Sequence, residues 1–387
     1  MTLWRLAAIG IAVTLGCGAP ASPPSRPAVA PPPTAPAVDT ASLDAYFKAH
    51  FPADEPGIAV LIAKRGRTVF SAGYGLADLG TREPITTRTL FNLGSLSKTF
   101  VASAILILQE RDKLSVDDPL SKYFPGFKHP ELAAKIQLRH LLTHTSGLPD
   151  NRPVEAQLDF YLTARDAENW YPVTQADALE FEPGAQFAYS NPAFDALALV
   201  VEQVGGRKWQ SFVHDEIFLP AGMATSTITD GPHPERGVAH GYYRDEQRAW
   251  HELDYGEVPT FAAAGNGGVW SSVEELARYE QALCAGRFLR PGTLADARTL
   301  KTFGNWASDE PPMVGWSWFI RDVDGLKEIG HTGSQGGFLT NYFIVPDKDL
   351  LVVFLMNGSG DRAGITDELH RWLREARWLD SSPSATP

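Results

Sequence analysis

The chain has 387 residues, of which 44% are hydrophobic and 21% charged, and its formal net charge is −12 at pH 7. This length and composition predict a globular protein with a large core, built as one large domain or as two coupled ones. The negative charge argues against nucleic acid as a partner, because phosphate binding needs a basic surface, and it disfavours adsorption to anionic membranes.

The first residues have the features of an export signal. Arg5 precedes an apolar run, residues 6–15, which is long enough for a signal-peptide core and too short to cross a bilayer. We interpret residues 1–16 as a signal peptide. The small residue before Cys17 resembles a bacterial lipoprotein cleavage site, which predicts a lipidated Cys17 and a location in the cell envelope or periplasm. Cleavage within residues 19–22, giving a soluble secreted protein, is the alternative, so any membrane contact would be through the lipid anchor alone.

The domain boundaries follow from composition. Residues 17–38 are mostly Pro, Ala and Ser, which cannot build a core and prefer extended conformations, so they predict a tether. We place the folded domain at 39–379 and a disordered tail at 380–387. The second cysteine, Cys284, has no partner once Cys17 is lipidated or removed, and we expect it to be a buried apolar residue.

Hydrophobic periodicity predicts strands at both ends of this domain and helices between them. In chain order we expect a short helix after Asp39, a β-hairpin over 57–70, helices over 101–108, 138–144, 192–204, 209–218 and 271–285, strands over 326–329, 338–345 and 350–356, and a last helix over 364–378. This order favours an α/β (α+β) fold. One antiparallel sheet would be built from both chain ends, with flanking helices and an inserted, mostly helical subdomain.

A serine and a lysine stand where an apolar extended segment gives way to a helix. Ser95 and Lys98 are three residues apart, so a helix places them on one face of its first turn. Free backbone N–H groups and the positive end of the helix dipole there suit a nucleophile and a developing oxyanion. Taken alone, an N-capping serine and a solvated lysine are the better explanation.

Two later stretches could complete a site. Tyr189 and Asn191 lie two apart just before a predicted helix, and residues 331–337, with the sequence His-Thr-Gly-Ser-Gln-Gly-Gly, join two predicted strands. Glycines at strand ends permit a ligand to approach the backbone closely. Each stretch also has a structural explanation, namely a helix cap with a buried tyrosine and a loop that needs positive φ.

In combination, Ser-x-x-Lys, Tyr-x-Asn and His-Thr-Gly, in this order, resemble the serine β-lactamase and penicillin-binding protein superfamily. The branch that fits contains class C β-lactamases, D-Ala-D-Ala carboxypeptidases, D-aminopeptidases and related esterases. Residues 91–98, 141–148, 189–192 and 265–268 are similar to recurrent stretches of that branch, and the resemblance covers about residues 39–378.

The resemblance implies a serine hydrolase that forms a covalent acyl-enzyme and needs no cofactor. Ser95 would be the nucleophile, and Lys98 and Tyr189 would share the base function, with either as the proton acceptor. Asn191 would bind the acyl-side amide of an ester, D-amino-acid peptide or β-lactam-like substrate, including peptidoglycan-derived ones. The backbone N–H groups of Ser95 and Ser334 would form the oxyanion hole.

The third motif departs from the pattern of the β-lactamases. They commonly have lysine where this chain has His331, ahead of Thr332 and Gly333. A lysine at this position has a permanent charge that helps to hold a substrate carboxylate, whereas a histidine is charged only near or below pH 6.5. We therefore expect an esterase or D-peptidase rather than an efficient β-lactamase, and an acid limb of the pH–rate profile due to His331.

The sequence supports other functions less well. A Ser-His-Asp hydrolase would need Gly-x-Ser-x-Gly, which neither Ser97 nor Ser334 matches. His140 and His144 have the spacing of a zinc pair, but Leu141 stands where the zinc-protease motif has glutamate, so we expect no metal. A catalytically idle cell-envelope protein that binds peptidoglycan or a partner in the same cleft is the alternative from another class.

Overall fold

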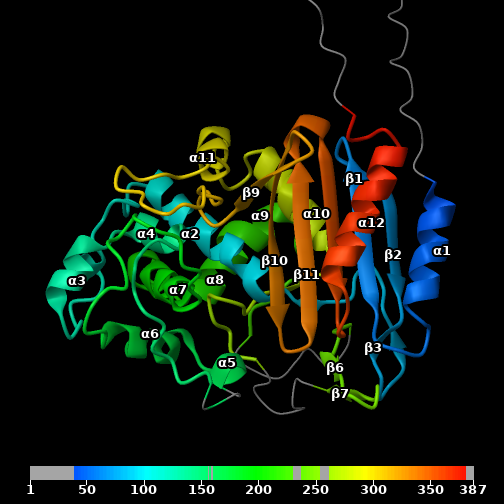
Figure 1. Cartoon of the computed structure of the whole chain (residues 1–387), viewed down its shortest axis with the longest axis horizontal. Helices are drawn as coiled ribbons and strands as arrows, with labels where there is room; N and C mark the ends of the chain where they lie inside the picture. Colours follow the sequence, from blue (N-terminus) through cyan, green and yellow to red (C-terminus); the bar gives the residue numbers. More distant parts are fainter. Residues whose placement is uncertain (1–38, 156, 158–159, 230–236, 253–260, 381–387) are drawn as a thin grey trace, which may run out of the picture. The chain divides into compact units, whose positions relative to one another are not determined.

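The computed structural model describes residues 39–380, except 156, 158–159, 230–236 and 253–260. Its centre is a six-stranded antiparallel sheet with the order β2-β1-β12-β11-β10-β9 (Figure 1). The strands are β1 (Ile58–Lys64), β2 (Arg67–Tyr74), β9 (Phe319–Val323), β10 (Leu326–Gln335), β11 (Phe338–Val345) and β12 (Leu350–Met356). The two ends of the chain meet in this sheet, since Ile58 pairs with Met356 and Lys64 with Leu350. The predicted sheet is confirmed.

Each central strand has side chains in two hydrophobic cores, one on each face of the sheet. Side chains alternate along a strand, so β1 sends Ala59 and Leu61 to one face of the sheet and Val60 and Ile62 to the other. On the second face, the helices α1 (Thr40–His50) and α12 (Arg362–Glu375) pack on the sheet through residues such as Phe47. Because both faces are covered, β1 and β12 are buried almost throughout, which explains their continuous apolar runs.

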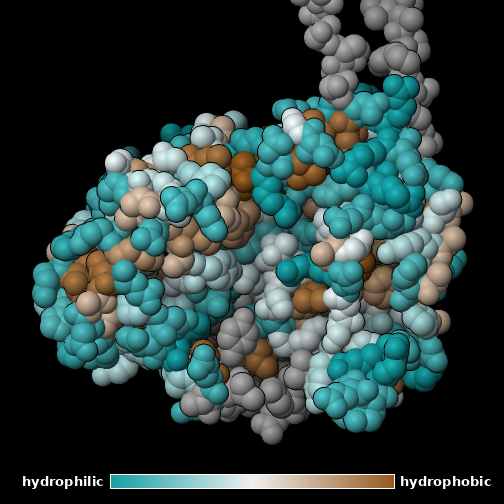
Figure 2. All heavy atoms as spheres, viewed as in Figure 1, coloured by the Kyte–Doolittle hydropathy of each residue, from teal (hydrophilic) through white to brown (hydrophobic). Residues whose placement is uncertain are grey.

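The helical region packs on the other face. Its core contains α2 (Lys98–Glu110), which is buried from Lys98 to Leu108. The remaining helices are α3 (Pro130–Lys135), α4 (Leu138–Leu142), α5 (Phe160–Thr163), α6 (Asp166–Thr174), α7 (Pro192–Gly205), α8 (Trp209–Val213), α9 (Leu219–Ala221), α10 (Val273–Cys284) and α11 (Pro291–Ala297). Hydrophilic residues cover most of the face seen in Figure 2, with apolar patches between them. No helix of the described residues is long and apolar enough to span a membrane.

Short elements join the two parts. Two-stranded ribbons pair β3 (Leu76–Asp78) with β4 (Glu83–Pro84), β5 (Phe91–Asn92) with β8 (Trp270–Ser271), and β6 (Tyr242–Arg244) with β7 (Trp250–Glu252). Single turns of other helix types are η1 (Gly94–Ser97), η2 (Leu120–Lys122), η3 (His214–Phe218) and η4 (Pro346–Lys348). Of these elements, β5 and η1 lead directly into α2 and so position the site.

Three predictions need correction. The strand expected to end at residue 329 continues to Gln335, so the His-Thr-Gly motif lies inside β10 and the connection is the turn at Gly336 and Gly337. The helix expected over 209–218 is regular only to Val213 and then widens into η3. Cys284 is exposed rather than buried, because it is the last residue of α10 and its thiol donates to Glu280.

The predicted signal peptide, the tether with Cys17 and residues 381–387 of the tail lie outside the described residues.

Candidate active site

Ser95 and Lys98 meet at the start of α2. Ser95 lies in the turn η1 and Lys98 is the first residue of α2, and the Lys98 Nζ donates to the Ser95 Oγ at 3.1 Å. The turn is fixed by Asn92, whose Oδ1 accepts the Gly94 N–H at 2.8 Å, and by a positive φ of 51° that glycine adopts easily. The structure thus brings this predicted pair into direct contact.

The Lys98 ammonium is fully buried and held by three acceptors. Besides Ser95, it donates to the Oδ1 of Asn191 at 2.9 Å and to the backbone oxygen of Asn266 at 2.7 Å. Burial lowers the pKa of Lys98 to about 7, an effect that the negative charge of Asp195 partly offsets and the positive charge of Arg152 reinforces. A lysine with this pKa is available as a proton acceptor near neutral pH.

A pair of buried carboxyls lies behind the lysine. The Nδ2 of Asn266 donates to both oxygens of Asp195 at 2.8 Å, and Asp166 accepts the Gly265 N–H at 2.6 Å. Burial raises the pKa of Asp195 to about 6, and burial together with Asp195 raises the pKa of Asp166 well above its usual value. Sequence analysis did not identify these residues, although an aspartate on the apolar face of α7, four residues after Asn191, was a usable signal.

Tyr189 lies at the rim of the same site. The residue is 43% exposed, its ring stacks on the His144 imidazole with centroids 4.3 Å apart, and the Lys98 Nζ is 5.1 Å from the ring centroid. Asn191 is the N-cap residue of α7, which explains how Tyr189 and Asn191 face one cavity from the loop before a helix.

The His-Thr-Gly motif reaches the serine because β10 passes against the turn η1. A Cβ on Gly333 would lie 2.0 Å from the backbone oxygen of Leu93, and one on Gly94 would lie 2.9 Å from the backbone nitrogen of Ser334. Glycine is needed at both positions for this close approach. The backbone of Ser334 therefore lies beside the turn that carries Ser95, as the predicted oxyanion hole requires.

His331 differs electrostatically from the expectation. It is 3% exposed, and its Nδ1 donates to the backbone oxygen of Thr332 at 2.6 Å. Burial, reinforced by the charge of Lys98, lowers the pKa of His331 to about 3. The imidazole is therefore neutral between pH 5 and 8. This corrects the expectation that His331 causes an acid limb of the pH–rate profile in that range.

One cavity of about 370 Å³ joins these groups, and it is lined by Ser95, Tyr189, Asn191, Phe319, His331, Thr332, Gly333, Ser334 and Arg362. Among these described residues, Arg362 is the one with a permanent charge. Its Nη1 donates to the backbone oxygen of Gly333 at 2.8 Å, which fixes the guanidinium at the mouth of the site. Sequence analysis missed Arg362 because it lies 31 residues after His331, at the start of α12.

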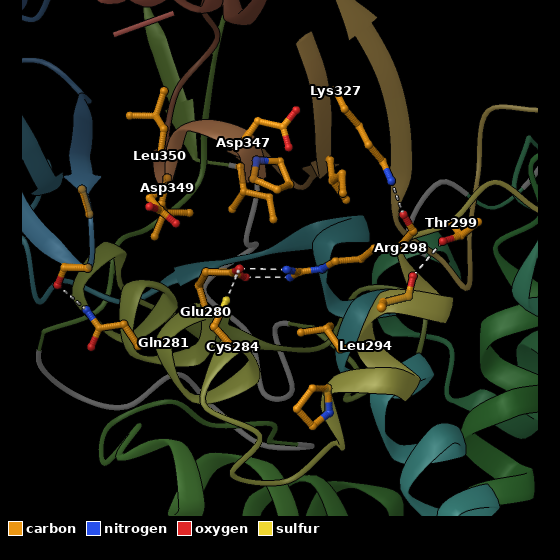
Figure 3. Close-up of a pocket in the computed structure, with 18 residues that line it drawn as sticks. Glu280, Gln281, Cys284, Leu294, Arg298, Thr299, Lys327, Asp347, Asp349 and Leu350 are labelled. Carbon is orange, nitrogen blue, oxygen red and sulfur yellow. Dashed lines mark hydrogen bonds and ion pairs between the residues drawn. The ribbon is translucent and has the colours of Figure 1, made fainter. Parts of the chain in front are cut away.

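A second cavity, of about 640 Å³, lies away from this site between α10, α11 and the sheet (Figure 3). Its wall contains the Glu280–Arg298 ion pair and Cys284. Cys284 as a whole residue is exposed, but its thiol is partly buried beside Glu280. This partial burial and the neighbouring Glu280 raise the pKa of the thiol to about 12, so Cys284 is not an activated nucleophile.

The two histidines considered as a zinc pair have separate structural roles. The Nδ1 of His140 accepts the Gln137 N–H at 3.1 Å, and the Nδ1 of His144 accepts the Ser190 N–H at 3.0 Å. In the described part of the chain, no group of three His, Cys, Asp or Glu side chains is arranged to hold a metal ion.

Comparison with known proteins gives one family. Residues 43–375 match the model of the β-lactamase family. The chain is 28% identical over 311 residues to the D-alanyl-D-alanine-carboxypeptidase/endopeptidase AmpH of Escherichia coli, covering 76% of this chain and 77% of that protein. It is 29% identical over 391 residues to the esterase EstB of Burkholderia gladioli, covering 89% and 97%. A penicillin-binding protein from Bacillus halodurans superposes with a TM-score of 0.72 at 26% identity, covering 84% and 98%.

Proposed function

Because the chain belongs to the β-lactamase family and is a serine hydrolase, we propose that it cleaves esters or D-amino-acid peptides through a covalent acyl-enzyme on Ser95. One observation carries the proposal: a fully buried lysine with a pKa lowered to about 7 donates a hydrogen bond to the Ser95 Oγ at 3.1 Å. A hydroxyl is a weak nucleophile at its own pKa, and an adjacent base activates it.

Acylation would proceed in balanced steps. The Ser95 Oγ bonds to the substrate carbonyl carbon, and its proton passes to neutral Lys98 or to Tyr189 in its phenolate form. The carbonyl oxygen becomes an oxyanion held by the Ser95 and Ser334 N–H groups. The bond to the alcohol or amine then breaks, and the base returns the proton to that leaving group. In the second half, the base takes a proton from water as the water oxygen bonds to the acyl carbon. The bond to the Ser95 Oγ then breaks, the base returns the proton to that oxygen, and the acid is released.

The substrate class follows from the charges around the cavity. Neutral, buried His331 cannot supply the cation that a β-lactam carboxylate meets in enzymes with lysine there. Arg362 supplies a permanent cation at the mouth instead, so anionic groups of a substrate would lie on that side. Asn191 would hold the acyl-side amide. Together with similarity to an esterase and a carboxypeptidase, this favours esters and D-amino-acid peptides, including peptidoglycan-derived ones, over β-lactams.

Such substrates fit the proposed location. The N-terminal sequence supports export, either as a lipoprotein anchored through Cys17 or as a soluble secreted protein. Mass spectrometry of the mature N-terminus from a bacterial host would distinguish the two, because a diacylglyceryl group on Cys17 is retained only in the lipoprotein.

The mechanism is tested by covalent labelling. A fluorophosphonate loses fluoride when a serine oxygen attacks its phosphorus, so intact mass should show one adduct on the wild type and none on Ser95→Ala. Equal labelling of both proteins would exclude Ser95. Turnover of p-nitrophenyl esters, D-Ala peptides and a chromogenic cephalosporin should then rank the cephalosporin last. Binding without turnover of any substrate would support the idle binding protein.

A further inference from the structure

We propose that His144 is a positioning residue that holds Tyr189 in place for proton transfer at Ser95. This inference rests on the proposed function and extends it to a residue outside the three motifs. It rests on the side-chain and backbone contacts of one residue of the 141–148 stretch.

His144 contacts Tyr189 and both of its neighbours in the chain. The backbone oxygen of His144 accepts the Ala188 N–H at 2.9 Å, and its Nδ1 accepts the Ser190 N–H at 3.0 Å. Between these two hydrogen bonds, the Tyr189 ring lies on the imidazole with centroids 4.3 Å apart and planes at 26°. One residue thus contacts the backbone on each side of Tyr189 and the face of its ring. Phe319 also stacks with that ring, but at a greater distance, with centroids 6.5 Å apart.

Tyr189 needs such support because it is not held by burial. It lies in the loop before α7, and 43% of its surface is exposed. An exposed ring on a loop samples several rotamers unless a neighbour fixes it. The imidazole, by contrast, is fully buried and is also packed by Phe187 and Phe194, at 5.7 and 5.2 Å between centroids.

The backbone of His144 is itself strained. Its φ is 57°, in the left-handed region, which residues other than glycine seldom adopt. The residue directly follows the last turn of α4 and Thr143, and its N–H donates to the Leu141 oxygen at 3.2 Å. This conformation turns the imidazole and the backbone oxygen toward residues 188–190 at the same time.

His144 does not act as the base. Because its Nδ1 accepts the Ser190 N–H, the proton of the neutral ring is on Nε2. Burial, together with the charges of Lys98 and His331, lowers the pKa of His144 well below its usual value. A neutral imidazole adds no charge beside Lys98 and Tyr189. His144 therefore acts by holding Tyr189 in position.

Two substitutions separate the two kinds of contact. His144→Asn keeps an acceptor for Ser190 and tolerates a positive φ, but it removes the ring. His144→Phe keeps a ring under Tyr189 but removes the acceptor. We expect each to lower kcat for a p-nitrophenyl ester about 10- to 100-fold, the scale of a 1 Å misplacement, with KM changed less than about threefold.

His140→Asn is the matched control. It removes another buried histidine, in α4, with the same kind of hydrogen bond from a backbone N–H to Nδ1, but its ring packs on Phe303. We expect it to lower the melting temperature while kcat of the folded protein stays within about twofold of the wild type, since surrounding packing alone is affected.

A double-mutant cycle gives the decisive measurement. If His144 acts through Tyr189, adding His144→Asn to Tyr189→Phe causes no further loss of kcat or of the fluorophosphonate labelling rate. Losses that multiply, or full kcat in both His144 variants, would overturn the inference. Should neither variant fold, Phe187→Leu loosens the imidazole more mildly, and its loss should likewise vanish when it is combined with Tyr189→Phe. Failure of the proposed function is seen separately, as absence of Ser95 labelling in the wild type.

Discussion

Lys98 is completely buried although its side chain carries an ionisable amine. Three oxygen atoms surround its Nζ within 3.1 Å, so the protonated form is hydrogen-bonded although it is dehydrated. Desolvation dominates and lowers the pKa of Lys98 to about 7. A base is most effective when its pKa is close to the working pH.

The first prediction concerns the pH–rate profile. If neutral Lys98 accepts the Ser95 proton, kcat/KM for a p-nitrophenyl ester should fall as pH decreases through about 7, because protonation removes the acceptor. The midpoint should be the same in His331→Asn, since His331 is already neutral there. A profile that is flat from pH 5 to 8 would contradict a role for Lys98 as base.

The second prediction concerns Asp195, whose negative charge raises the pKa of Lys98 against the effect of burial. Asp195→Asn removes that charge and should move the acid limb of the profile to lower pH. Measuring kcat/KM from pH 5 to 9 in both proteins gives the shift independently of any overall loss of rate. A limb that moves to higher pH would show that Asp195 does not act through its charge.

At the scale of elements, the site depends on two contacts that no local pattern indicates. The strand β10 crosses the turn η1 at Gly333 and Gly94, and α12 supplies Arg362. Ser95, Lys98, Tyr189 and Asn191 could be proposed as site residues from the sequence because each belongs to a short spaced motif. Arg362, Asp166 and His144 are brought to the site by tertiary packing, so spacing could not reveal their contacts with it.

The same reasoning explains which elements were predicted. The apolar runs of β1 and β12 and the mostly apolar β11 are buried on both faces, and their hydrophobic patterns predicted them. The edge strand β9 and the end of β10 were missed. These segments contain exposed polar residues and glycines, which do not favour a strand unless a neighbouring strand pairs with them. Gly330 and Gly333 permit close approach to neighbouring backbone or side-chain atoms.

The third prediction concerns the ion pair in Figure 3, which ties α10 to the segment after α11 and to β11. Arg298 donates to both oxygens of Glu280 at 2.8 and 2.6 Å, and Tyr342 also donates to Glu280. Glu280→Gln leaves a buried guanidinium without its anion and should lower the free energy of unfolding by about 3–5 kcal/mol. Chemical denaturation measures this loss.

The control for that experiment is Glu375→Gln on α12. Glu375 pairs with Arg371, but both side chains are largely exposed, so solvent screens the pair and little stability should be lost. Ester hydrolysis per folded molecule should be unchanged in both variants, because neither residue lines the cavity with Ser95. An equal effect of the two substitutions would show that burial of the Glu280 pair is unimportant.

At the scale of the whole molecule, the site lies between the sheet and the helical region. Tyr189 and Asn191 come from the helical region, and His331 to Ser334 come from the sheet, whose strands derive from both chain ends. Pairing Ile58 with Met356 closes a long loop, and such non-local contacts form slowly in folding. The site is therefore complete only when both the sheet and the helical region have folded.

The last prediction links the buried Lys98 to the stability of the whole protein. Lys98 has a pKa of about 7 in the folded protein and its usual value of 10.5 when unfolded. Between these values the unfolded chain binds a proton that the folded chain does not. The wild type should therefore gain stability relative to Lys98→Met as pH rises from 7 to 10, by at most about 1.4 kcal/mol per pH unit. Below pH 7 both states are protonated, and the difference should be constant. Urea denaturation of both proteins at several pH values measures it, and a constant difference from pH 6 to 10 would mean that the buried lysine keeps its charge.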